Sequence, residues 1–470
     1  MTDTAVGGYD NVRAVRVREI VFLTETSEGC RRWISAMPSK LLDIENQFLL
    51  QGKYQEWPHE HISLLINIIK GEYHKHTAVL LRFWCISLQI IIYGVIMKMY
   101  PHVTLGPIGT VRERLPFAEH AIKIAAIIFG LAVLFDMFRQ LTTGELTIAL
   151  IAGYLWRGLS YGLVIGLAGV GLSLTYDLLD FANFAHGDYI TLSAFVGWGV
   201  AYLVAGFGQF KTGSLLFLGV GGTVYPQDVG ISVTNAPIAI LIGLVMAALV
   251  GALLAVALDS AVYKSMRGAG NITLLIASVG VAFILRYGAV YLFTQQTFGL
   301  TADSWSYKLG LPGGTVTITS ASLLLIFVSL LMMLGVHLLL TQTKLGKSMR
   351  AMAANQQLAR VTGIPSEKII RRTWLIGGAL AGIAGFMIAL LQGTINYQIG
   401  WTLLLLVFAG VIMGGIGSVY GAIVGGILVG LITRVSLIWI PASFTEATGF
   451  AVMILILLTR PAGIFGGDVS

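Results

Sequence analysis

Long apolar runs separated by short polar stretches make up most of the chain after residue 76. Each run is close to the roughly 20 residues that an α-helix needs to cross a hydrocarbon layer of about 30 Å. The pattern therefore predicts membrane-spanning helices. The expected spans are 77–97, 118–138, 150–176, 184–206, 236–262, 272–293, 320–341, 371–391, 401–416, 419–434 and 445–459. Residues 1–76 are polar, carry charges of both signs and contain only short apolar runs.

Composition agrees with a membrane protein. Only 11% of the residues are charged and 56% are hydrophobic, whereas soluble domains are about 25% charged. The 57 glycines suggest that helix backbones approach one another closely. Glycines four residues apart, which share one helix face, are Gly162/Gly166, Gly378/Gly382, Gly421/Gly425 and Gly426/Gly430. We expect an all-α, glycine-rich polytopic transmembrane bundle of about 8 core helices, with about 2 extra N-terminal membrane segments.

A basic polar segment lies between the spans 320–341 and 371–391. From residue 344 to residue 372 it holds seven Lys or Arg residues and one acid, Glu367. The positive-inside rule places this segment in the cytoplasm. It contains a short Ala-rich stretch that ends at residues 363–365, and we expect a cytoplasmic coupling helix that docks a soluble partner.

The same rule assigns the other loops. The loop 263–271 carries Lys and Arg and is expected to be cytoplasmic, whereas the loops 207–235 and 294–319 contain few cations and are expected outside. Counting back from these loops places residues 1–76 outside. The alternative is that one segment within 118–176 is re-entrant or lies at the membrane surface.

Polar residues at the start of one span are the first candidates for chemistry. Asn183, His186 and Asp188 directly follow a glycine-rich span, and ionisable groups in such a place are costly unless they are partnered. They indicate either a broken helix that lines a substrate path or a helix cap with an interhelical hydrogen-bond cluster. Arg286, inside the span 272–293, would meet an anionic substrate group, extend to the interface, or pair with a neighbouring helix.

Two other patterns do not support chemistry. Residues 341–348 end in Gly-Lys-Ser like a phosphate-binding loop, but that loop needs glycine where a threonine stands, and it needs a preceding strand. Any ATP must then be bound by a partner. The histidine pairs His59/His61 and His74/His76 do not share a helix face and lack further ligands, so no metal site is expected.

Five motifs follow one another along residues 150–466. They are NFAHGD (183–188), the set Asp259, Tyr263, Lys264 and Arg267, the segment LGKSMRAMAANQQLARVTGI (345–364), GGIGSVYGAIVGG (414–426) and RPAGIFG (460–466). Together they resemble the signatures of the permease subunits of branched-chain amino acid ABC importers. The resemblance covers about two thirds of the chain, and it predicts a permease domain over residues 150–466. Residues 77–149 would be extra membrane segments, and the role of residues 1–76 is open.

The resemblance implies a multi-pass subunit of the cell membrane that is not itself an enzyme and has no cofactor of its own. In the family, two like or related permeases pair, two cytoplasmic ATPases dock on the coupling segments, and an external binding protein delivers the substrate. The implied coupling residues are Gly346, Arg350, Ala354, Ala359, Gly363 and Ile364. Independently of the resemblance, Gly414, Gly415 and Gly417 interrupt the stretch 401–434, which predicts either a helix break or a tight turn between two spans. The candidate substrate-path residues remain Asn183, His186, Asp188 and Arg286.

The expected cargo is a branched-chain or other hydrophobic amino acid, with urea, short amides or another small polar solute as the alternative. Residues 353–355, Ala-Ala-Asn, depart from the acid that related permeases often carry there. A stand-alone channel or secondary transporter is a rival hypothesis, although ion coupling would need a central carboxylate and Asp136, Asp188 and Asp259 lie near span ends. An intramembrane enzyme using His186 and Asp188 as acid and base lacks a nearby nucleophile.

Overall fold

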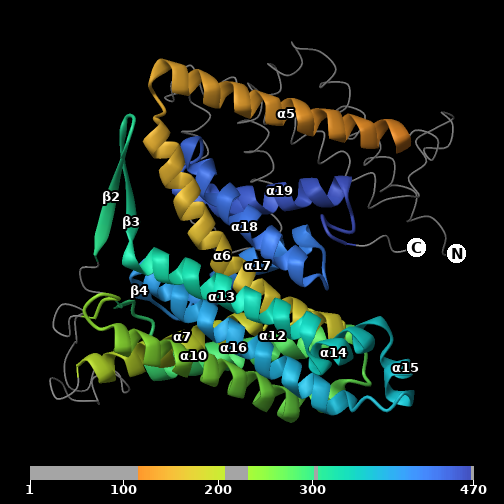
Figure 1. The fold of residues 1–470 in the computed structure, drawn as a ribbon. Coiled ribbons are helices and arrows are strands. Elements are labelled where there is room, and N and C mark those ends of the chain that lie inside the picture. Colours follow the sequence, from red (N-terminus) through yellow and green to blue (C-terminus); the bar gives the residue numbers. More distant parts are fainter. Residues whose placement is uncertain (1–114, 207–230, 301–304, 467–470) are drawn as a thin grey trace, which may run out of the picture. The chain divides into compact units, whose positions relative to one another are not determined.

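The computed structural model describes residues 115–206, 231–300 and 305–466 (Figure 1). The chain divides into two compact units, residues 1–89 and 90–470, and every described residue belongs to the second. The expected span 77–97, the polar segment 1–76 and part of the loop 207–235 lie outside the described residues.

Within the described ranges, eight helices are long and apolar enough to cross a membrane. They are α6 (Ile148–Leu179), α7 (His186–Ala205), Pro237–Met266, α12 (Asn271–Phe293), α13 (Ser320–Gln342), α16 (Ser366–Gln392), Val419–Ile438 and Ala442–Thr459. A shorter apolar helix, α17 (Ile399–Gly414), accompanies them. The prediction of a mostly helical polytopic bundle is thus confirmed. The helix α5 (Leu115–Thr143) covers the expected span 118–138 but is not among the eight.

Three of these segments contain more than one helical form. The segment Pro237–Met266 joins α10 (Pro237–Leu258), the π-helical turn η2 (Asp259–Tyr263) and α11 (Lys264–Met266). Val419–Ile438 joins α18 (Val419–Val435) to the 3₁₀ turn η3 (Ser436–Ile438), and Ala442–Thr459 joins the 3₁₀ turn η4 (Ala442–Phe444) to α19 (Thr445–Thr459). The basic segment forms α14 (Lys344–Ala354) and α15 (Gln356–Val361).

The sequence-based expectation of purely helical structure was wrong in two places. The strands β2 (Ser306–Leu311) and β3 (Gly314–Thr319) form an antiparallel hairpin, and β1 (Phe298–Gly299) pairs with β4 (Thr394–Ile395). The β3 sequence, GTVTIT, is rich in β-branched residues, which favour strands. The connection is Pro312-Gly313, and Gly313 has a φ of +83°, a conformation that favours glycine.

The described bundle has two ends, which we name by what they carry. The hairpin end holds β2–β3, and β3 packs beside α6 near its first residues. The basic end holds α14 and α15, which follow α13 and precede α16. The two ends are visible in Figure 1, where the green strands and the cyan short helices lie far apart.

Glycine contacts allow the central helices to pack backbone against backbone. A Cβ atom on Gly162 of α6 would lie 2.7 Å from the Cα of Ile427 on α18, closer than side chains ever pack. A Cβ on Gly410 of α17 would lie 3.1 Å from the Cα of Gly426 on α18. Gly378 of α16 meets Gly251 of α10 in the same way. The predicted role of the glycine pairs in helix packing is therefore confirmed.

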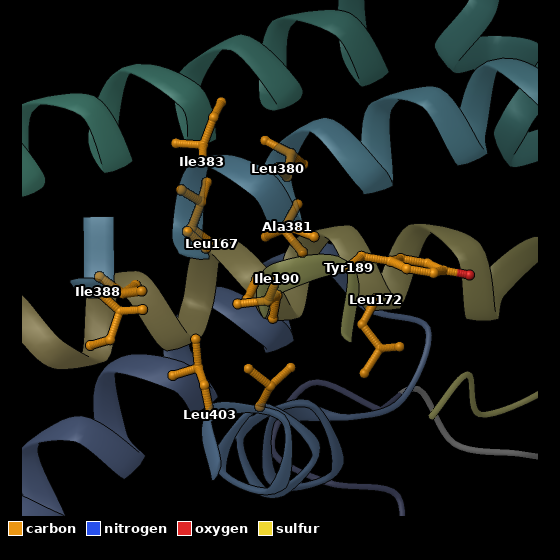
Figure 2. Packing of buried hydrophobic residues seen from close by; sticks show 14 of the residues in the cluster. Leu167, Leu172, Tyr189, Ile190, Leu380, Ala381, Ile383, Ile388 and Leu403 are labelled. Atoms are coloured by element: carbon orange, nitrogen blue, oxygen red, sulfur yellow. The ribbon is translucent and has the colours of Figure 1, made fainter. Parts of the chain in front are cut away.

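The core lies where α6, α7, α16 and α17 meet. Leu167 and Leu172 of α6, Ile190 of α7, Leu380 of α16 and Leu403 of α17 are all buried, and they pack together in the interior (Figure 2). Their burial fixes how far apart these four helices lie, and so it fixes the position of the polar residues between them.

We predict that Gly426→Ala destabilises the protein, whereas Gly280→Ala does not. A Cβ on Gly426 overlaps the backbone of Gly166, and overpacking of this kind costs about 1–3 kcal/mol. Gly280 of α12 has open space around its Cα. Thermal unfolding in detergent would be monitored by size-exclusion chromatography of heated samples. The midpoint temperature should be lower than wild type for Gly426→Ala and unchanged for Gly280→Ala. Equal midpoints for the two variants would contradict the packing assignment.

Candidate functional site

The helix α7 begins inside the bundle rather than at its edge. After α6 ends at Leu179, the chain turns at Asp180, which has a φ of +54°, and runs back along the bundle before α7 starts at His186. The His186 Nε2 atom lies 3.1 Å from the backbone oxygen of Ala168. Ala168 lies on α6 about 16 Å from its end, at 1.5 Å per residue. The first turn of α7 therefore lies deep among the other helices.

Asn183 holds this returning segment in place. Its Oδ1 atom accepts hydrogen bonds from the Ala185 backbone N–H, at 3.1 Å, and from the Tyr263 hydroxyl, at 3.2 Å. Its Nδ2 donates to the Tyr189 hydroxyl, at 3.4 Å. Because Asn183 and Tyr263 are buried, these bonds satisfy polar groups that water cannot reach.

Asp188, in the first turn of α7, forms an ion pair with Arg286 of α12. The Arg286 Nε lies 3.3 Å from Asp188 Oδ1, and the pair has side-chain exposures of 13% and 1%. The Arg286 guanidinium also lies over the Trp401 ring, 4.2 Å from its centroid. Three roles were considered for Arg286, and the structure shows the third, an ion pair with a residue on a neighbouring helix. The Trp401 ring adds a second favourable contact.

The first turns of α7 and α17 touch at this point. The Gly400 backbone N–H donates to Thr191 Oγ1, at 3.1 Å, and the Thr191 hydroxyl donates to the Gly187 backbone oxygen, also at 3.1 Å. A Cβ on Gly187 would lie 2.8 Å from the Gly400 oxygen. Two helix N-termini, each with a positive dipole end, therefore meet beside a buried ion pair.

A second polar cluster lies at the basic end. The Arg267 guanidinium donates to Asp259 at 2.6 and 2.7 Å and to Glu367 at 2.8 and 3.0 Å. Lys264 is 3.5 Å from the same Glu367. Bidentate contacts of this kind fix geometry more strongly than single ones. Arg267 thereby ties the end of α10 to the first turn of α16.

Tyr263 connects the two clusters. It belongs to the π-helical turn η2 that also contains Asp259, and such turns are frequent at functional sites. Its ring stacks on Trp374 of α16, with centroids 5.4 Å apart and an angle of 11°. Because its hydroxyl bonds Asn183, a continuous series of contacts runs from Glu367 to the start of α7.

The predicted coupling residues fall into two groups. Gly346 and Ala359 are buried, and a Cβ on Gly346 would overlap the last turn of α13. Arg350 and Ala354 are exposed, as is Gly363, and Ile364 is half-buried. The Arg350 guanidinium bonds the Leu340 backbone oxygen, which fixes α14 against α13.

Gly363 ends α15 through its backbone conformation. Its φ is +83°, its N–H bonds the Arg360 oxygen at 3.1 Å, and the Ile364 N–H bonds the Ala359 oxygen at 3.0 Å. These two bonds define a Schellman motif, in which glycine avoids the strain of a left-handed residue. Side-chain space is not the constraint here, because a Cβ atom added to Gly363 would have no neighbour within 4 Å.

Two exposed apolar residues on α15 were not among the sequence-based candidates. Leu358 is 60% exposed and Val361 is 85% exposed, one helical turn apart. The signal was present in the sequence as two apolar residues at a spacing of three in a polar segment. The two side chains form a small exposed apolar pair on an otherwise polar segment.

The glycines at 414–417 form a turn between α17 and α18. Gly415 and Gly417 have φ values of +109° and +83°, and Ser418 Oγ accepts from the Gly421 N–H at 3.0 Å to begin α18. The C-terminal segment packs here, since Ile464 N–H bonds the Met413 oxygen at 3.0 Å. Among the residues that the structure describes, no group of three or more His, Cys, Asp or Glu side chains is placed to hold a metal ion.

Comparison with known proteins gives the family. Residues 154–458 match the family described as branched-chain amino acid transport system / permease component. The chain is 26% identical to the high-affinity branched-chain amino acid transport system permease protein BraD of Pseudomonas aeruginosa over 321 residues, which is 66% of this chain and 94% of BraD. It is 25% identical to the corresponding protein LivH of Escherichia coli over 323 residues, with the same coverage.

A relative that matches a shorter part of the chain carries another description. The autoinducer 2 import system permease protein LsrC of Yersinia enterocolitica is 28% identical over 188 residues, which is 38% of this chain and 52% of LsrC. No solved structure matches the chain. The region that matches the family contains both polar clusters and the segment α14–α15. This chain belongs to the branched-chain amino acid transport permease family, as a multi-pass, non-catalytic membrane component of an ABC importer.

Proposed function

We propose that this chain forms the translocation path of an ATP-driven importer for branched-chain or other hydrophobic amino acids. The observation that carries the proposal is the buried Asp188–Arg286 pair beside the meeting first turns of α7 and α17. A free amino acid carries one positive and one negative group. A site with a carboxylate, a guanidinium and two helix N-termini offers both groups a partner.

The descriptions of the relatives support an amino acid as the substrate. BraD and LivH, which this chain matches over most of their length, are described as branched-chain amino acid permeases. The second candidate is an importer of the same class for urea, a short amide or another small polar solute. The shorter match to LsrC, described as an autoinducer 2 import permease, favours keeping that candidate.

In the proposed cycle, the Asp188–Arg286 pair opens to admit the substrate. The substrate ammonium would bind the Asp188 carboxylate, and its carboxylate would bind Arg286 or the N–H groups at the start of α7. Trp401, now stacked on Arg286, would contact the apolar side chain. Asn183 and His186 position α7 through their bonds to Tyr263 and to the α6 backbone.

The driving force would come from partner proteins. Membership of an ABC permease family implies ATPases and a binding protein, and we assign ATP binding to two cytoplasmic ATPase subunits. They would dock on α14 and α15, with Leu358 and Val361 inserted into a pocket of the ATPase. A second permease would complete the path, and an external binding protein would deliver the solute.

Coupling would follow the contacts already described. Movement of α15 shifts the first turn of α16, which carries Glu367, and the bidentate contacts of Arg267 transmit that shift to η2. Tyr263 then displaces Asn183 and the returning segment before α7. Packed elements joined by such contacts move as discrete units, so a shift at the basic end would reach the ion pair.

The substrate role predicts a specific pattern for variants of the ion pair. Asp188→Asn leaves Arg286 buried and unpaired, which costs about 3–5 kcal/mol, so membrane levels should fall. The double variant Asp188→Asn with Arg286→Gln removes both charges and should restore the level but not the transport. We expect uptake of radiolabelled leucine, normalised to membrane level by immunoblot, at least tenfold below wild type (about 1.4 kcal/mol).

A control removes an exposed charge. Glu145 is 60% exposed and lies 3.8 Å from Arg139, which keeps its closer partner Asp136, so Glu145→Gln should leave uptake unchanged. Normal uptake in the double variant of Asp188 and Arg286 would mean that the pair is only structural.

The docking role predicts that Gly363→Val abolishes uptake without lowering the membrane level. Valine is strained at a φ of +83°, so the end of α15 should shift, at a cost of about 1 kcal/mol or more. Gly268→Val is the control, because Gly268 also lies at the basic end and has open space but no left-handed φ. ATP-driven uptake and membrane level would be measured in parallel. Wild-type uptake in Gly363→Val would exclude α15 from ATPase docking.

A further inference from the structure

A cavity of about 350 Å³ lies at the hairpin end, apart from the ion pair and the basic end. It lies between α6, α16, α18 and the junction of β3 with α13. Its walls include Trp156, Arg157, Tyr161, Gln392 and Arg434. The volume falls in the range of small-molecule sites.

The cavity has a positive lining. Arg157 and Arg434 both line it, and no Asp or Glu does. Among the described residues, neither arginine forms an ion pair. Glu446, in the first turn of α19, is a carboxylate that acts electrostatically on Tyr161, but it is exposed and is not part of the cavity wall. The Arg434 guanidinium lies over the Tyr161 ring, 4.4 Å from its centroid. This contact orients the guanidinium but leaves its N–H donors available.

The guanidinium groups are the charged donors of the lining. Each guanidinium has several N–H donors and no acceptor. Two of them at one cavity with no carboxylate in its wall favour a ligand with negative charge, and a carboxylate accepts paired N–H bonds from a guanidinium.

A second, smaller cavity extends from the first toward the ion pair. Its volume is about 130 Å³, and it shares Tyr161 and Gln392 with the larger cavity. Its other walls include Ile399 and Thr402 in the first turn of α17. These two residues flank Gly400 and Trp401, so the small cavity ends at the first turn of α17, which carries the Trp401 ring that contacts Arg286.

We propose that the larger cavity is an entry site that binds the carboxylate of the incoming amino acid, before the substrate reaches the Asp188–Arg286 pair. This inference rests on the proposed function. Arg157 and Arg434 bind the carboxylate, and Tyr161 contacts the apolar side chain. The oxyanion of a lipid headgroup has the same chemistry, and the experiment separates the two sources.

The test measures the charge preference of the cavity in the full chain, purified in phosphatidylcholine nanodiscs with Cys30 and Cys85 replaced by serine. Thr317→Cys places a thiol on the cavity wall, and Tyr307→Cys on β2 is the reference. We expect an anionic methanethiosulfonate, relative to a cationic one, to react about tenfold faster at position 317 than at the reference. Because Lys308 lies directly across the hairpin from Thr317, Lys308→Gln is included in every protein compared. Adding Arg157→Gln and Arg434→Gln should then abolish the remaining preference.

Ligand protection identifies the source of the anion. Leucine and isovalerate, which carry a carboxylate, should slow the anionic reagent at position 317, and isovaleramide should not. No preference, or a preference that survives the loss of both arginines, overturns the proposal. Protection by nanodiscs that contain an anionic lipid, without protection by leucine or isovalerate, assigns the cavity to lipid and also overturns it.

A transport measurement keeps the two proposals separate. In the reconstituted importer, Arg434→Gln should raise the KM for leucine with little change in maximal rate, because the site acts on capture. A wild-type assembly that takes up no amino acid defeats the proposed function, and the protection result then still decides whether the cavity binds carboxylates.

Discussion

A helix that begins in the middle of an apolar bundle leaves backbone N–H groups where water is absent, and each unsatisfied group costs several kcal/mol. Residues 180–188 meet this constraint largely with their own backbone, since the His186 N–H bonds the Asn183 oxygen at 3.3 Å and the Asp188 N–H bonds the Ala185 oxygen at 3.0 Å. Asn183 accepts the Ala185 N–H, and Asp188 places a negative charge in the first turn of α7, near the positive end of the helix dipole. The carboxylate would itself be costly there without Arg286. The ion pair and the start of α7 therefore depend on each other.

Close backbone packing makes this arrangement possible. The first turns of α7 and α17 can meet only because Gly187 and Gly400 carry no side chains. On the other side, glycines bring α6 against α18 and α10 against α16. The helices around the ion pair are therefore tightly fixed. The contacts from Glu367 through Arg267 and Tyr263 to Asn183 are the connection by which the basic end can influence α7.

Much of this fold follows from hydrophobic pattern, and the rest depends on pairings that no local pattern encodes. The spans were predictable because a run of apolar residues has one stable form in a bilayer. Asn183, His186 and Asp188 were identifiable because polar residues are costly at such a position. The partner of Arg286 was not predictable, since Asp188 is 98 residues away and Trp401 lies on a third helix. The β2–β3 hairpin lies in a loop that was expected to be irregular because it is too polar to form a span, although its β-branched residues favour strands. Arg157 and Arg434 belong to different helices, and only folding brings them to one cavity.

The central claim is that this chain works as the permease of an ATP-driven importer, and purification of the native complex tests it most directly. The protein would be extracted in mild detergent and its partners identified by mass spectrometry. The account predicts two ATP-binding subunits and a second permease in stoichiometric amounts. Reproducible recovery of this chain alone, in folded form, would contradict it and favour a channel or secondary carrier.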